Sequence, residues 1–134
     1  MAGYSGTPLA RKLGIKEGTR FAVRGGPPDL GEALEPVPDG ARQLRRISRP
    51  LDVAVAFFTA RKDVVARWPS LTGAVAPNGT VWIGWPKRSS GVPTDITEDT
   101  LREDLLPTGW VDNKVCAIDD TWSGLGFALR RELR

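Results

Sequence analysis

One run of apolar residues, from Leu51 to Thr59, constrains the fold of this chain more than any other feature. Val53-Ala54-Val55-Ala56-Phe57-Phe58 is apolar at every position, so a strand built from it must be buried on both faces. Strands of this kind belong to the interior of a parallel sheet that helices cover on two sides. The run therefore predicts a central strand of an α/β sheet.

A helical pattern and a second buried strand follow that run. Residues Arg61 to Ala76 place apolar side chains at helical spacing, namely Val64, Val65, Trp68, Leu71 and Val75. Pro69 could bend this helix, and Pro77-Asn78-Gly79 predicts a turn that ends it. Because a helix-length connection joins two buried runs, Val53–Phe58 and Val81–Trp85 are predicted to be adjacent, parallel, central strands.

Weaker patterns complete a single α/β domain over residues 1–134. Pro8 after Thr7 and Gly14 after Leu13 predict a short helix, in a segment (residues 1–19) that packs on the domain. The other expected elements are strands over Arg20–Arg24, Arg42–Ser48, Asn113–Ile118 and Leu125–Arg131, a helix over Pro28–Leu34, and a helix that begins with the capping-box spacing of Asp95 and Glu98. Their alternation predicts a mostly parallel sheet of about six strands between two helical layers.

The composition excludes several kinds of active site. The 134 residues include no histidine and one cysteine, Cys116, so no His-based triad, histidine metal ligand or intrachain disulfide can form. Neither a metal site nor a catalytic group is expected. The net charge of +3 is too small to indicate nucleic-acid binding by itself. With no secretory pattern and no apolar run near the ~20 residues of a membrane span, a cytoplasmic protein is predicted.

The stretch from Leu51 to Trp85 resembles the second half of a class I methyltransferase domain. The shared parts are a buried strand, an amphipathic helix, a Pro-x-Gly turn and another strand, and the last two expected strands resemble that fold's terminal antiparallel hairpin. The resemblance implies a three-layer Rossmann-like fold. It also implies the strand order 2-1-3-4-6-5, with the last strand reversed.

The resemblance breaks down where methyltransferases bind their cofactor. Those enzymes place a glycine-rich loop after the first strand and an acid at the end of the second strand, which holds the ribose. Here the corresponding segments are Arg24-Gly25-Gly26-Pro27-Pro28 and Arg46-Ile47-Ser48-Arg49. Two prolines remove two backbone donors, and arginine cannot accept a hydrogen bond from a ribose hydroxyl. No cofactor is predicted, and S-adenosylmethionine in particular is not expected to bind.

Over nearly its whole length the chain more closely resembles a family of small actinobacterial proteins classed as a domain of unknown function. The match rests on Gly3-Tyr4-Ser5-Gly6-Thr7-Pro8-Leu9, Trp85-Pro86-Lys87, Ser90-Gly91-Val92-Pro93-Thr94-Asp95 and the run from Lys114 to Gly124. The resemblance implies the same fold and a bacterial, cytoplasmic setting. It implies no reaction.

Ligands of open α/β sheets bind beyond the carboxyl ends of the strands, and two polar segments are expected there side by side. The first is Lys87-Arg88-Ser89-Ser90-Gly91, whose cations and hydroxyls suit a phosphate or carboxylate group. The second is the hairpin tip Asp119-Asp120-Thr121-Trp122-Ser123. Its tryptophan could stack on a ligand or anchor a partner, or it could fold back onto the core while Asp120 and Ser123 bond their own turn.

Three other groups receive a structural interpretation. The acids Asp95, Glu98, Asp99, Glu103 and Asp104 are predicted to stabilise a helix N-terminus and to form a solvated face. Cys116 lies among apolar neighbours and is predicted to be a buried small hydrophobe. The arginines Arg42, Arg45, Arg46 and Arg49 are predicted to protect an exposed sheet edge, because no aromatic side chain alternates with them for base stacking.

Three functions remain open from the sequence. The favoured one is a non-catalytic or regulatory module that binds a small anionic ligand or a protein partner. The second is a divergent transferase-type enzyme with an unrecognised site. The third is a nucleic-acid-associated protein that uses the strand from Arg42 to Arg49, which the mild charge argues against.

Overall fold

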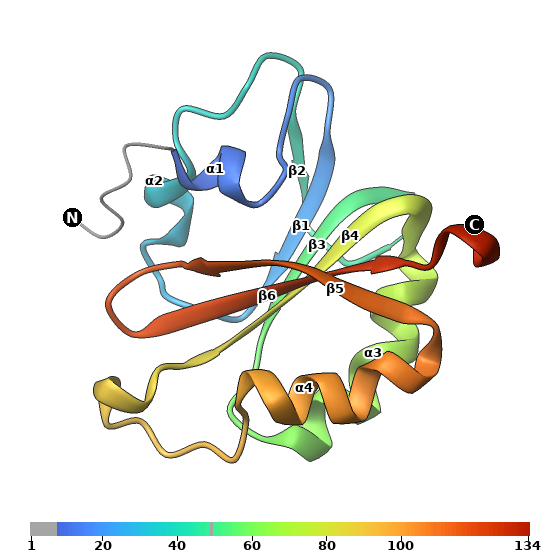
Figure 1. Cartoon of the computed structure of the whole chain (residues 1–134). Coiled ribbons are helices and arrows are strands. Elements are labelled where there is room, and N and C mark those ends of the chain that lie inside the picture. Colours follow the sequence, from blue (N-terminus) through green and yellow to red (C-terminus); the bar gives the residue numbers. More distant parts are fainter. Residues whose placement is uncertain (1–7, 49) are drawn as a thin grey trace.

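A computed structural model describes residues 8–48 and 50–134. Its core is one six-stranded sheet in the order β2-β1-β3-β4-β6-β5 (Figure 1). The strands are β1 (Arg20–Arg24), β2 (Arg42–Leu44), β3 (Leu51–Phe57), β4 (Val75–Pro86), β5 (Trp110–Ala117) and β6 (Trp122–Leu129). The predicted strand order is confirmed.

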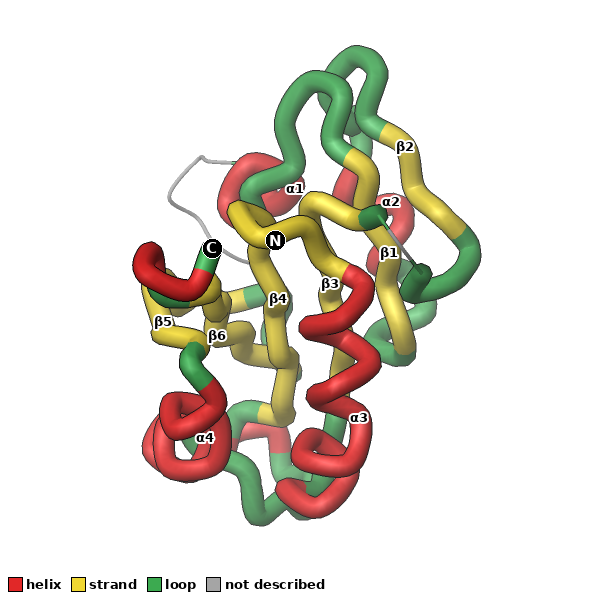
Figure 2. The backbone as a smooth tube through the Cα atoms, turned by 90° about the vertical axis from the view of Figure 1, so that its right-hand side faces the viewer, coloured by secondary structure: helices red, strands yellow, loops and turns green. Residues whose placement is uncertain are grey.

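Helices cover the sheet on both faces, which gives the expected three layers (Figures 1 and 2). The α-helices are α1 (Leu9–Lys12), α2 (Leu30–Leu34), α3 (Arg61–Ala74) and α4 (Glu98–Leu105), with short 3-10 helices η1 (Arg88–Ser90), η2 (Leu106–Thr108) and η3 (Arg131–Leu133). One hydrophobic core lies between the sheet and α1 and α2, and a second lies between the sheet and α3 and α4. None of the helices in the described part of the chain is long and apolar enough to cross a membrane.

The central strands have the predicted directions. β1, β3 and β4 are parallel, and Ala54 lies opposite Val81 and Ala56 opposite Ile83. β6 is antiparallel to both β4 and β5, so it is the reversed strand of the C-terminal hairpin. Side chains of β3 alternate between the two cores, which explains why this strand is apolar at every position from Val53 to Phe57.

Tryptophans connect the helical layers to the sheet. Trp82, 1% exposed, donates its indole N–H to the carbonyl of Leu13 at 2.9 Å and so fixes the end of α1 against β4. Its ring lies across Gly124 and Gly126 of β6, where an added Cβ would come within 3.1–3.3 Å of the indole. On the other face Trp68 packs edge-on against Trp110 and donates to Thr108 at 3.0 Å. Both core positions predicted for Trp68 and Trp82 are confirmed.

The predicted turn at Pro77-Asn78-Gly79 is wrong. β4 begins at Val75, directly after α3, and runs through these residues to Pro86. The ladder between β3 and β4 shifts register between Leu51 and Val53, so the extra residues are accommodated as a bulge. A Cβ at Gly79 would lie 2.7 Å from the carbonyl oxygen of Asp52, and glycine permits that close approach. Val65, predicted to face the core, is 51% exposed.

Other element boundaries differ from those expected. β2 contains three residues and ends at Leu44, short of Ser48, and α2 begins at Leu30 after Pro28 has formed a turn. α4 is capped by Thr97, which exchanges hydrogen bonds with Thr100, and Asp95 and Glu98 do not form the capping box. The strands of the hairpin each begin three residues before the predicted position. The proposed cap Thr7 lies outside the described residues.

Gly84→Ala tests the tight packing of β4 against β3. A Cβ at Gly84 would lie 2.5 Å from Cδ2 of Phe57, so the substitution overpacks this site and should lower the free energy of unfolding by about 1–3 kcal/mol. Urea denaturation measures this loss. Adding Phe57→Leu should make the double variant less costly than the sum of the single changes, because the clashing ring is gone.

Gly31→Ala is the matched control for that substitution. Gly31 lies in α2 and has nothing within 4 Å of an added Cβ, so alanine there should stabilise the protein by up to about 1 kcal/mol. Equal effects of Gly84→Ala and Gly31→Ala would contradict the packing described here.

Candidate functional site

The structure brings the two predicted polar segments together at the carboxyl edge of β4. The backbone N–H of Lys87 donates to the carbonyl of Thr121 at 2.7 Å, and Pro86 and Trp85 lie opposite Trp122 and Ser123 in the ladder. The tip of the β5–β6 hairpin therefore lies beside the segment that leaves β4. The predicted juxtaposition is present in the backbone.

The side chains of the first segment divide into structural and free groups. Ser90 accepts a hydrogen bond from the N–H of Val92 and donates to the carbonyl of Lys87 at 2.6 Å, so it closes the turn of η1. Arg88 and Ser89 are exposed, and Lys87 is half-buried. Within the described residues, no ion pair joins Lys87 or Arg88 to the acids of the hairpin tip.

The hairpin tip is ordered by Asp119, not by the predicted Asp120 and Ser123. The Oδ1 atom of Asp119 accepts from the N–H groups of Thr121 and Trp122 at 2.8 and 2.7 Å. Asp120 is exposed, and Thr121 and Ser123 are half-buried. Trp122 is also half-buried, and it packs edge-on against Phe57 with ring centroids 5.1 Å apart. One part of its ring contacts the core and the rest reaches solvent.

Phe57 lies at the crevice at which the strand order reverses, beside an open cavity of about 390 Å³ that it lines together with Arg24, Phe58, Asp63, Ala66, Arg67 and Ser70. In an open α/β sheet this crevice lies beyond the carboxyl ends of two neighbouring strands whose following connections run to opposite sides of the sheet. Those two strands are β1 and β3 here. The ring of Phe57 lies so close to the backbone that a Cβ at Gly26 or at Gly84 would be 2.5 Å from it. Gly26 belongs to the loop after β1, and Gly84 belongs to β4. The side chain is 8% exposed, so hydrocarbon occupies this position.

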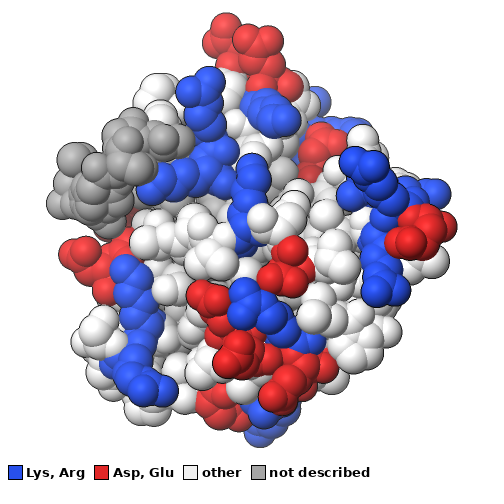
Figure 3. Space-filling model, viewed as in Figure 1, with Lys and Arg blue, Asp and Glu red and all other residues white. Residues whose placement is uncertain are grey.

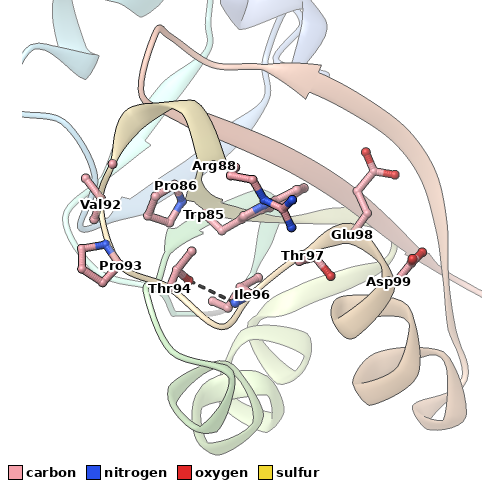
Figure 4. Close-up of a pocket in the computed structure, with 11 residues that line it drawn as sticks. Trp85, Pro86, Arg88, Val92, Pro93, Thr94, Ile96, Thr97, Glu98 and Asp99 are labelled. Carbon is pink, nitrogen blue, oxygen red and sulfur yellow. Dashed lines mark hydrogen bonds between the residues drawn. The ribbon is translucent and has the colours of Figure 1, made fainter.

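A larger open cavity, of about 600 Å³, lies at the carboxyl end of β4 (Figure 4). Trp85 and Ile96 are its buried apolar residues, and Val92 and Pro93 add apolar surface at the outer loop. Arg88 extends across the cavity toward the start of α4, where Glu98 and Asp99 lie. The cavity thus combines an apolar surface with one cation and two carboxylates.

Polar contacts fix the loop over residues 86–97 to the rest of the protein. Thr94 donates to the carbonyl of Thr59 at 2.6 Å and accepts from the N–H of Ile96 at 3.1 Å. The carboxylate of Asp95 accepts from the N–H of Arg61 at 2.8 Å and so satisfies the first turn of α3. These contacts anchor the loop to the connection between β3 and α3 and to the start of α3.

Two arginines hold α4, the opposite wall of the cavity. Arg61 of α3 binds Asp104 with two hydrogen bonds, at 2.8 and 3.0 Å, and Glu103 with one at 3.3 Å. The hydrogen bonds with Asp104 raise the pKa of this guanidinium above its ordinary value. The predicted solvated acidic face is wrong for Asp104, which is partly buried and attaches α4 to α3, whereas Glu103 is exposed as predicted.

Arg102 performs the same role on the other side of α4. Its guanidinium donates to Asp112 of β5 and to Glu98 at 3.0 Å each, and it approaches Asp99 at 3.4 Å. The hydrogen bond with Asp112 raises the pKa of Arg102. Glu98 and Asp99 at the cavity thus share one guanidinium with Asp112, whereas Arg88 takes part in no ion pair with another described residue.

Sequence reasoning missed most of the residues that line the cavity. Of the two predicted segments only Arg88 and Gly91 line it, and the other lining residues are Trp85, Pro86, Val92, Pro93, Thr94, Ile96, Thr97, Glu98 and Asp99. The available signal was the composition of residues 91–97, where a glycine, a proline and two threonines connect an expected strand to an expected helix.

The remaining candidate groups have structural surroundings. Arg42 lies on β2, the edge strand, and Arg45 and Arg46 follow it as exposed residues, while Arg49 lies outside the described residues. Cys116 is half-buried beside α1. Burial raises the pKa of its thiol, and the charge of Lys12 opposes that shift only in part. Among the described residues no cluster of acids and cysteine could hold a metal ion.

The fold is similar to that of solved S-adenosylmethionine-dependent methyltransferases. An Aquifex aeolicus enzyme of that class is 13% identical with a TM-score of 0.59, over 89% of this chain and 86% of that one. The N-methyltransferase NodS from Bradyrhizobium japonicum is 12% identical with a TM-score of 0.60, over 92% and 93%. DhpI, solved with SAH, is 13% identical with a TM-score of 0.61, over 92% and 83%.

Sequence comparisons add no closer relative. No family model and no curated protein sequence matches the chain, so the resemblance to an actinobacterial family stays a prediction. The structural likeness at these identities concerns the fold alone. The protein has a methyltransferase-like α/β fold.

Proposed function

We propose that this protein is a non-catalytic binding module that holds a small amphipathic anion in the cavity between β4, the loop over residues 86–97 and α4. The observation that carries the proposal is the position of Arg88 across an apolar surface formed by Trp85 and Ile96. Ligand sites are typically apolar cavities with a few polar groups that fix orientation, and about 600 Å³ is within their usual range of volume. An apolar body with one carboxylate or phosphate suits these groups.

Arg88, the cation that lines the cavity, is the group that favours an anionic ligand. Glu98 and Asp99 could attract a cation, but both already bind Arg102. Arg88 has no such partner among the described residues, and Lys87 adjoins it in sequence. A guanidinium can bind a carboxylate or phosphate through two parallel hydrogen bonds, which fixes the orientation of the ligand.

The residues at the carboxyl ends of β1 and β2 support a role without the methyltransferase cofactor. The ring of Phe57 packs directly against Gly26 in the loop after β1, which is the loop that methyltransferases use to hold their cofactor. Pro27 and Pro28 in the same loop have no N–H to donate to a ligand. β2 ends at Leu44 and is followed by Arg45, so no carboxylate is available there for a ribose. These features argue against the divergent transferase as the alternative function.

Binding of a model anion tests the proposal. We expect 3-phenylpropionate, added to ¹⁵N-labelled protein, to shift the amide resonances of Gly91, Thr94 and Thr97, which line the cavity. Arg88→Gln should remove these shifts without changing the thermal midpoint, because the exposed Arg88 side chain takes part in no described ion pair.

Two controls define the result of that titration. Arg46→Gln changes another exposed arginine, far from Arg88 in the sequence, and should leave the shifts intact. The neutral compound 3-phenylpropionamide should bind more weakly than 3-phenylpropionate. Unchanged shifts in Arg88→Gln, or shifts confined to residues outside the cavity, would show that the site lies elsewhere.

A second prediction concerns the cofactor itself. Titration calorimetry with S-adenosylmethionine and with S-adenosylhomocysteine at physiological concentrations should give no binding heat, because Phe57 packs against the loop after β1 and the two prolines of that loop have no N–H to donate. An active methyltransferase run in parallel verifies the titrant. A micromolar dissociation constant for either compound would refute the non-catalytic assignment and favour the transferase.

A further inference from the structure

β5 is one of the two edge strands of the sheet, and β2 is the other. α4 is attached to the first half of β5 through Arg102 and Asp112. The second half is open, since Asn113, Lys114, Val115 and Ala117 are all exposed. An exposed strand edge offers unpaired N–H and C=O groups to any further strand.

The hairpin register identifies which backbone groups point outward. The N–H of Ile118 donates to the carbonyl of Trp122 at 2.9 Å, so these residues mark a hydrogen-bonded position at the end of the hairpin. Hydrogen-bonded and non-hydrogen-bonded pairs alternate in an antiparallel ladder. Val115, opposite Leu125, and Ala117, opposite Ser123, therefore direct their N–H and C=O groups away from β6. An added strand can pair with these four groups.

A basic groove accompanies this edge. Its volume is about 560 Å³, and it is lined by Arg11 and Lys12 of α1 and by residues 114–117 of β5. None of the three cations Arg11, Lys12 and Lys114 takes part in an ion pair with another described residue. Figure 3 shows basic side chains gathered over the part of the surface where α1 lies, while acidic ones gather over α4.

The two sides of the edge differ in chemistry. Lys114 and Cys116 lie opposite Gly126 and Gly124, on the face of the sheet that Trp82 and α1 cover. Val115 alternates with them and faces the other side, where it is 54% exposed. A strand beside β5 would thus meet cations on one face and an apolar side chain on the other.

We propose that the open half of β5 binds an extended acidic segment of a partner protein as an additional antiparallel or parallel strand. Acidic side chains of that segment would face Arg11, Lys12 and Lys114, and its alternate apolar side chains would pack on Val115. Strand addition of this kind combines backbone hydrogen bonds with recognition of alternate side chains. Charge disfavours a second copy of this chain, because pairing β5 with itself would bring two sets of the same three cations together.

The probe is the peptide acetyl-Glu-Val-Glu-Val-Glu-Val-Glu-amide, carrying a fluorescent label. We expect it to bind in fluorescence anisotropy, to weaken as salt is raised, and to shift the amide resonances of Val115 and Ala117. The triple variant Arg11→Gln, Lys12→Gln and Lys114→Gln should weaken binding at least tenfold. Lys62→Gln, an exposed charge change on α3, is the matched control and should have no effect.

A peptide of the same sequence with every backbone nitrogen methylated separates strand addition from simple charge attraction. It keeps the charge and loses the donors needed for pairing, so it should not bind. Equal binding of both peptides, or shifts outside β5 and α1, would overturn the proposal. So would sedimentation showing a stable dimer with Val115 and Ala117 amides protected from hydrogen exchange, because the edge would then belong to a second copy.

Discussion

The arrangement of the carboxyl edge depends on one aromatic ring packed against backbone that has no side chain. Phe57 extends from β3 between Gly26 of the loop after β1 and Gly84 of β4, and Trp122 closes over it from β6. Three strands and a loop therefore meet around one ring. Glycine is required at both contacts, because a methyl group at either would overlap the ring. The ring thereby closes the space between Gly26 and Gly84, and open cavities remain on either side of it, one beside α3 and one between β4 and α4.

Ion pairs fix the position of α4, the neighbouring wall of the cavity. Arg61 attaches α4 to α3, and Arg102 attaches α4 to β5, so five carboxylates around this helix are bound by two guanidinium groups. Exposed ion pairs of this kind each contribute little to stability. Their consequence here is positional, because they orient the start of α4 and leave Arg88 as the cation of the cavity.

Most of the fold could be predicted from the sequence because its central strands have an unambiguous pattern. The continuous apolar run of β3, and the helix-length distance to the next run, already imply parallel neighbours in a covered sheet. Local signals failed where a tertiary contact determines the backbone. Pro77-Asn78-Gly79 has the composition of a turn, yet pairing with β3 and the close approach of Asp52 draw it into β4.

The candidate site was predictable only in its backbone. Two strands that end on one edge bring Lys87 and Thr121 together whatever their side chains do. The role of each side chain depends on short-range geometry that the sequence does not show. Asp119 and Ser90 form hydrogen bonds within their own turns and are not available to a ligand in the way that the sequence suggested. Ile96, Glu98 and Asp99 line the cavity because Arg61 and Arg102 hold α4 in its position. Those ion pairs join separate elements, so no local sequence pattern predicts the position of α4.

The tethers of Thr94 and Asp95 have a consequence for the thermodynamics of binding. They hold the loop over residues 86–97 to the connection between β3 and α3 and to the start of α3 in the free protein, so the wall of the cavity is formed before any ligand arrives. A ligand then need not order this segment, and each rotamer-rich side chain that is already fixed spares roughly 0.5–1.5 kcal/mol of entropic cost. Even a small molecule with few contacts can therefore retain a useful share of its interaction energy as affinity.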